Sequence, residues 1–231
     1  MIAFDAEDLR DLLLILLTFG AGAVDAISFL GLGHVFTGNM TGNIVLLGLA
    51  AGRAAGSEAT RSAVSLVAFS AAVLVVWWAS RRSSGDRLPV SVVAAFGVEA
   101  VAQAGFLMGW LLSSARPSGA LEAVLVGVSA VAMGLQSGAV MRLGIRGIST
   151  TYVTGTLTGL ISELVTLSGS RRSWIRRGFV LVALLAGAAC AGVLLVGARR
   201  VAPALPLAVT TLVGLGAIIL ARYAGKPARP S

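Results

Sequence analysis

The chain has few of the residues that soluble enzymes use for chemistry. Its 231 residues include one cysteine, one histidine and one lysine. A single cysteine, Cys190, excludes an internal disulfide and leaves no cysteine-based metal site or haem attachment. The sequence contains no His-Glu-x-x-His, Gly-x-Ser-x-Gly or P-loop pattern, the signatures of zinc proteases, serine hydrolases and ATP-binding loops. We therefore expect no catalytic residues, no metal, no cofactor and no ATP-driven transport, and we do not expect an enzyme.

Charged residues are also scarce, at 12% of the chain against 57% hydrophobic residues, and the mean hydropathy is +0.92. A soluble globule of this composition would have too little polar surface. Six apolar runs approach or exceed the roughly 20 residues that a helix needs to cross a bilayer. The sequence therefore predicts an all-α integral membrane protein with transmembrane helices at Leu12–Gly33, Ala63–Ala79, Leu88–Leu112, Ala120–Met141, Gly178–Ala198 and Ala204–Tyr223.

Two further apolar runs, at Val35–Ala51 and Ile148–Leu167, are shorter and richer in polar residues. Each contains a Thr-Gly-x-x-Thr-Gly pattern, beginning at Thr37 and at Thr154. A pattern repeated at half the chain length indicates an internal duplication. We expect one membrane domain over residues 1–231, with repeats at about 12–112 and 120–223. The Thr-Gly segments are either short spans or re-entrant segments.

Most basic residues lie in the gaps between apolar runs, so the net charge of +8 is a topology signal and not a sign of nucleic-acid binding. If six runs cross, the basic residues divide 13 to 5 between the two sides, whereas eight crossings divide them 11 to 7. The first division favours six spans with both termini in the cytoplasm. Three spans per half would insert the two repeats in opposite orientations. The acidic segment Met1–Asp11 does not read as a cleavable signal peptide.

Four stretches resemble the YoaK-like family of bacterial membrane proteins: Gly22–Phe29, Val35–Asn43, Gly134–Gln136 and Thr150–Thr158. The resemblance covers most of the chain. It implies a small bacterial inner-membrane protein with about six spans, and it brings no established substrate or catalytic residues. One position departs from the family pattern, because Ser137 stands where that pattern favours asparagine.

The Thr-Gly segments are the candidate substrate site. Broken backbone at membrane depth is tolerated only where protein, water or a ligand satisfies its N–H and C=O groups. We expect N–H groups and polar side chains of both segments to converge on a small anionic or zwitterionic solute. Alternatively, the small residues only let helices pack closely. The candidate substrate-binding residues are Thr37, Asn39, Thr41, Asn43, Gln136, Thr154, Thr156 and Thr158.

Three carboxyl groups within or near the apolar runs are candidate proton carriers: Asp25, Glu99 and Glu163. A charged carboxylate inside a bilayer must be neutralised, paired or hydrated. We hypothesise a secondary transporter or channel for a small polar solute, with proton coupling through these groups. The alternative is a membrane scaffold or regulatory protein without flux, and the third and least favoured class is a membrane-embedded enzyme. The bilayer is the expected partner, and the sequence leaves homo-oligomerisation open.

Overall fold

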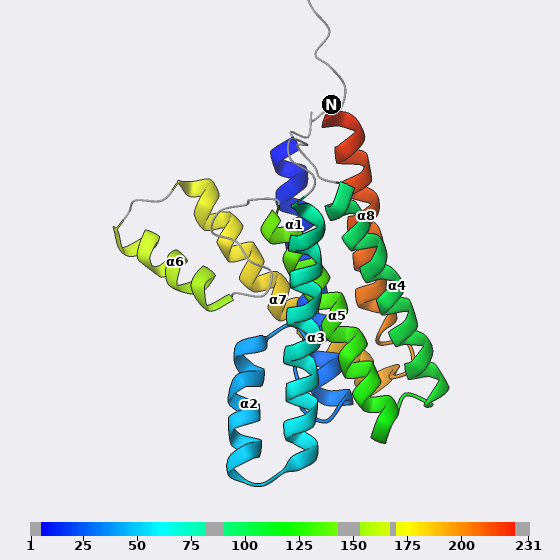
Figure 1. Ribbon diagram of the computed structural model, residues 1–231. Coiled ribbons are helices and arrows are strands. Elements are labelled where there is room, and N and C mark those ends of the chain that lie inside the picture. Colours follow the sequence, from blue (N-terminus) through cyan, green and yellow to red (C-terminus); the bar gives the residue numbers. More distant parts are fainter. Residues whose placement is uncertain (1–5, 82–89, 143–152, 167–169, 225–231) are drawn as a thin grey trace, which may run out of the picture.

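The computed structural model describes residues 6–81, 90–142, 153–166 and 170–224, and these residues form helices and connecting turns without a strand (Figure 1). Eight helices follow one another along the described chain. They are α1 (Ala6–Gly31), α2 (Met40–Gly52), α3 (Gly56–Ser80), α4 (Val90–Leu112), α5 (Gly119–Arg142), α6 (Val153–Thr166), α7 (Arg171–Gly197) and α8 (Ala204–Ala224).

Five of the six predicted spans are confirmed as helices long and apolar enough to cross a membrane, namely α1, α3, α4, α5 and α7. The sixth run forms α8, whose apolar described part, Ala204–Ile219, is shorter. The two Thr-Gly runs form α2 and α6, which have 13 and 14 residues. At 1.5 Å per residue such helices are about 20 Å long, less than the hydrocarbon thickness of ~30 Å.

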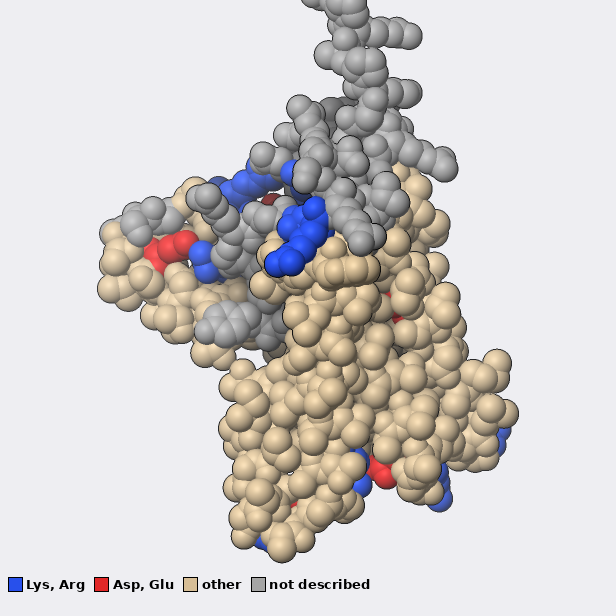
Figure 2. Space-filling model, in the orientation of Figure 1, with Lys and Arg blue, Asp and Glu red and all other residues tan. Residues whose placement is uncertain are grey.

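The six longer helices form a bundle, with α2 and α6 attached to its outside (Figure 1). Helix α1 packs against α7 and α8, helix α5 packs against α3 and α4, and α4 also contacts α8. Helix α2 lies against α3 at one end of the bundle, whereas α6 lies against α7 toward the other. On the face drawn in Figure 2, charged side chains gather mostly at the two ends, with an uncharged band between them.

Glycines bring the helix pairs into close contact. Gly187 in α7 lies against the backbone carbonyl of Phe19, and Gly22 in α1 lies against that of Leu184. In the α3–α5 pair, a Cβ atom on Gly134 would lie 2.5 Å from the carbonyl oxygen of Phe69. Small residues at such crossings let backbones approach where larger side chains would separate them.

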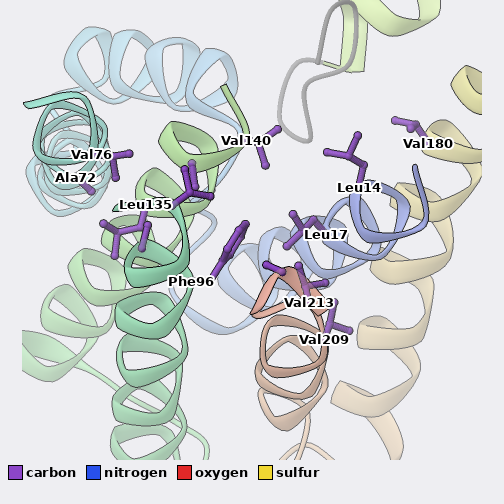
Figure 3. Close-up of a cluster of buried hydrophobic side chains, with 14 residues drawn as sticks. Leu14, Leu17, Ala72, Val76, Phe96, Leu135, Val140, Val180, Val209 and Val213 are labelled. Carbon is purple, nitrogen blue, oxygen red and sulfur yellow. The ribbon is translucent and has the colours of Figure 1, made fainter. Parts of the chain in front are cut away.

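The apolar core joins helices from both halves of the chain (Figure 3). Leu14 and Leu17 of α1 meet Val209 and Val213 of α8, with the Phe96 ring of α4 beside them. A second buried cluster, which contains the fully buried Trp110, packs nearer the α4–α5 turn. This cluster includes Leu32 and Val35, so the core packs against the start of the segment that joins α1 to α2.

Candidate functional site

The candidate site is centred on the interrupted segment between α1 and α2, residues 32–39. Gly33 and His34 have positive φ angles of 72° and 61°, which turn the chain back after α1. The Asn39 side chain caps α2 by accepting a hydrogen bond from the backbone N–H of Gly42 at 3.2 Å. The helix therefore begins at Met40, within the Thr-Gly pattern that starts at Thr37.

Asp25 holds this segment from α1. Its Oδ1 atom accepts hydrogen bonds from the backbone N–H groups of Thr37 at 3.0 Å and Gly38 at 2.7 Å. Asp25 as a whole residue is half-buried. We expected these N–H groups to face a solute, but a carboxylate of the protein itself occupies them. The isolated carboxyl and the first Thr-Gly motif are thus two parts of one site.

Asn43 fixes the other side of the segment. Its Oδ1 atom accepts from the backbone N–H of Phe36 at 3.0 Å, and its Nδ2 atom donates to the Phe36 carbonyl at 2.6 Å. Nδ2 also donates to the Ser65 hydroxyl of α3 at 3.0 Å, and that hydroxyl donates to the same carbonyl at 2.7 Å. Asn43 is fully buried. It therefore joins the segment, α2 and α3 into one unit.

The remaining polar residues of the first motif divide between interior and surface. The buried Thr37 hydroxyl lies 2.8 Å from the Ser129 hydroxyl of α5. Asn39 and Thr41 are exposed. Of the four candidate residues in this motif, two are thus held within the protein and two face outward.

The second motif lies apart from the first. Thr154 and Thr158 are exposed on α6, whereas Thr156 is buried. The structure does not bring this motif next to the first, because α6 packs on α7 (Figure 1). Glu163 accepts a hydrogen bond from the Ser173 hydroxyl at 3.0 Å and pairs with Arg177 at 3.1 Å. The stretch before α6, including Thr150 and Thr151, lies outside the described residues.

Glu99 belongs to a separate buried cluster between α4 and α8. Its Oε1 atom accepts hydrogen bonds from Gln103 Nε2 at 3.1 Å and from the Thr210 hydroxyl at 2.9 Å. Glu99 Oε2 and Gln103 Oε1 are buried without a hydrogen-bond partner among the described residues. A cavity of about 20 Å³ beside Gln103 and Ser129 has room for one water molecule. The arrangement places a second carboxyl group in the interior.

Gln136 is buried in α5, and its Nε2 atom lies 3.4 Å from the Leu17 carbonyl of α1. It therefore links helices of the two halves. Among the described residues, no three His, Cys, Asp or Glu side chains are grouped so that they could hold a metal ion.

Sequence reasoning missed Ser65 and Ser129, which hold the segment from α3 and α5. Both are hydroxyl residues within apolar runs, and this feature is the only sequence signal that could have identified them as site residues. Which loop they would meet depends on helix packing, which periodicity alone does not give.

Comparison with known proteins assigns the chain to a family. The model of a family described as "Protein of unknown function (DUF1275)" matches residues 13–218. The chain is also 39% identical over 155 residues to the UPF0700 transmembrane protein YoaK of Bacillus subtilis (strain 168), an alignment that covers 67% of each chain. No solved structure matches the chain.

Proposed function

The chain belongs to the DUF1275 family, which matches most of its length, and we propose that it is a proton-coupled secondary transporter for a small polar solute. One observation carries the proposal. Asp25, a carboxyl group within a membrane-spanning helix, holds the backbone of an interrupted segment through hydrogen bonds from Thr37 and Gly38. Ionisable groups within spans are costly and characteristically serve proton or substrate pathways.

The proton would act by changing the strength of this contact. A carboxylate accepts N–H hydrogen bonds roughly twice as strongly as a neutral group. Protonation of Asp25 therefore weakens its hold on the segment. Because Asn43 joins Phe36 to α2 and to Ser65 of α3, a change in the segment is passed on to both helices. The charge of one group is thereby linked to the position of α2.

The packing supports two related halves. The contact between α1 and α7 corresponds to that between α5 and α3, and the contact of α2 with α3 corresponds to that of α6 with α7. Glycines lie at both principal crossings, Gly22 against α7 and Gly134 against α3. In Figure 1, α1, α4 and α7 run in one direction, whereas α5, α8 and α3 run in the other. Opposed halves with interrupted helices are a common transporter design.

The topology we propose has six spans, with α8 as the sixth, and re-entrant α2 and α6. Residues 171–177 of α7 contribute four arginines to the end that also holds the start of α1, where Arg172 pairs with Asp8 at 2.6 Å. Arg142 reaches the Ser80 carbonyl at the same end. We place this end, with both termini, in the cytoplasm of a bacterial inner membrane.

The test is proton movement driven by a solute gradient. Purified protein is reconstituted into liposomes that contain a pH-sensitive dye and is exposed to gradients of glycine betaine, glutamate, succinate or glucose. We expect at least one gradient to change the internal pH with the wild type. Asp25→Asn should abolish that change, because the amide keeps an acceptor oxygen but cannot cycle a proton.

Folding of the variant is checked by size-exclusion chromatography and thermal unfolding in detergent. Asp8→Asn is the matched control, because Asp8 is an exposed carboxyl at the start of α1 that pairs with Arg172 and not with the interrupted segment. If no gradient moves protons with the wild type, and Asp25→Asn changes only the unfolding temperature, the protein is a scaffold in which Asp25 is structural.

A further inference from the structure

A cavity of about 310 Å³ lies between the end of α1, α2 and α3. Small-molecule sites have volumes of roughly 300–1,000 Å³. Phe29 and Leu46 supply apolar walls, and the charged side chains in the lining are those of Arg53, Glu58 and Arg61. The cavity thus combines apolar surface with a small number of charged groups.

Arg61 has hydrogen-bonding capacity that the protein does not use. Its side chain is 19% exposed, and its nearest carboxylate, Glu122 of α5, lies 3.8 Å away. Its buried Nε atom has no hydrogen-bond partner among the described residues. By contrast, Arg53 and Glu58 are close together at 2.6 Å, with exposures of 65% and 47%. Arg61 is therefore the cation best placed to receive an anionic group.

The backbone beside Arg61 is shaped to leave it room. Gly33 has a φ of +72°, and a Cβ atom there would lie 2.6 Å from Arg61 Nε and 2.6 Å from Glu122 Oε1. The next residue, His34, also lines the cavity and holds a φ of +61°. Strained backbone of this kind is concentrated at functional sites.

We propose that this cavity binds a small solute that carries a carboxylate and an apolar body, with the carboxylate on Arg61. A guanidinium group presents parallel N–H donors that match the two oxygens of a carboxylate. Phe29 and Leu46 would contact the apolar part. The exposed Arg53–Glu58 pair marks a mouth that opens toward water at the helix ends, since exposed charges are costly against hydrocarbon.

The same cavity contacts the segment that Asp25 holds. The Phe29 ring stacks on Phe36 at 4.9 Å and meets His34 edge-on at 5.1 Å. Phe36 directly precedes Thr37, and Leu46 belongs to α2. A solute in the cavity therefore contacts α2 through Leu46 and the interrupted segment through His34, two of the elements that would shift when Asp25 is protonated. In this respect the inference rests on the proposed function, and it names the solute class.

The test measures binding by isothermal titration of the full-length protein in detergent. The probe is benzoate, with benzamide as its uncharged counterpart. We expect the wild type to bind benzoate and not benzamide. Arg61→Gln should weaken binding by roughly tenfold to a hundredfold, as expected for the loss of charge-assisted hydrogen bonds. Arg116→Gln, an exposed arginine in the turn between α4 and α5, is the charge-matched control and should bind as the wild type does.

Glu122→Gln separates a binding role from a structural one. It removes the carboxylate that competes for Arg61, so benzoate should bind more tightly to this variant. Equal loss of binding in Arg61→Gln and Glu122→Gln would overturn the proposal, because it would identify a structural ion pair. No benzoate binding to the folded wild type would also overturn it.

Binding in nanodiscs with and without phosphatidylglycerol shows whether the cavity takes the carboxylate of a soluble solute or the phosphate of a lipid. Unchanged benzoate affinity supports a site for a soluble solute, whereas abolished binding in the anionic nanodiscs would assign the cavity to a lipid phosphate and overturn the proposal. Benzoate binding without any solute-driven proton movement would leave the cavity as a site and refute only the transport function. Proton movement that needs Asp25 but is unaffected by Arg61→Gln would refute only the cavity.

Discussion

Asn43 and Asn39 belong to the same motif, yet the structure gives them different roles. Asn43 is fully buried and makes three short hydrogen bonds, two to Phe36 and one to Ser65. Asn39 is exposed and caps α2 through one bond to Gly42. Asn43 is therefore a buried clamp on the interrupted segment, whereas Asn39 is an exposed helix cap. Replacing each in turn compares these two roles for the same residue type.

Asn43→Leu keeps the side-chain size and removes all three bonds. The Phe36 N–H is then buried without an acceptor, which costs about 1–3 kcal/mol. The Phe36 carbonyl still accepts a hydrogen bond from Ser65. The loss of the bonds that Asn43 Nδ2 donates therefore adds only about 0.5–1.5 kcal/mol to this cost. We therefore expect the free energy of unfolding to fall by about 2–4 kcal/mol. Asn39→Ala, which removes an exposed cap, should cost about 1 kcal/mol.

The assay is reversible unfolding in mixed detergent micelles, together with hydrogen exchange of the peptide that covers residues 34–52. Asn43→Leu should speed exchange at Phe36, whereas Asn39→Ala should affect mainly the first turn of α2. Equal stability losses in the two variants would refute the clamp. A folded Asn43→Leu protein with wild-type stability and no solute flux would instead identify Asn43 as a direct solute contact.

Two further predictions concern the bundle. Gly134→Ala should lower the free energy of unfolding by about 1–3 kcal/mol, because the new methyl group would collide with the Phe69 carbonyl. Gly97→Ala, which has nothing within 4 Å, should be neutral or add up to about 1 kcal/mol; equal losses in detergent unfolding would contradict the close crossing. Glu99→Gln should have a free energy of unfolding that is higher than the wild-type value or within about 1 kcal/mol of it, because glutamine keeps an acceptor for Thr210 and avoids burying an ionisable group. A markedly less stable Glu99→Gln protein would show that the cluster needs the carboxyl group.

The sequence was sufficient to predict the long helices, because hydropathy and length decide whether a segment can span a bilayer. It also located the interruption before α2, since Gly38 and Gly42 stand among polar residues within an otherwise apolar run. It did not place the start of α2, because the N–H groups of Thr37 and Gly38 bond to Asp25 and not to a preceding turn. The contact between Asp25 and Thr37 spans twelve residues and a reversal of the chain. That reversal depends on the φ angles of Gly33 and His34, which no hydropathy pattern encodes.

For a related reason, the sequence could not predict which candidate residues are buried and which are exposed. Thr37 and Thr41 are four residues apart, yet one is buried against Ser129 and the other is exposed. The motif spans a turn and the first turn of a helix, so neither a period of 3.6 nor one of 2 assigns its faces. The Arg61 cavity was missed because its lining comes from three elements.

In the two-repeat arrangement that we propose, the halves differ at the positions that would control movement. Asp25 follows Gly22 in α1, and Ser137 follows the corresponding Gly134 in α5. Asp25 holds a backbone segment, whereas the Ser137 hydroxyl is buried without a hydrogen-bond partner among the described residues. Asn43 likewise corresponds to Leu160 in the second motif, where no amide can clamp a preceding turn. A proton on Asp25 would therefore act on the first half alone. If the protein alternates between two open states, the free-energy difference between them is set mainly by one carboxyl group, and substitutions at Ser137 should leave the pH dependence of flux unchanged.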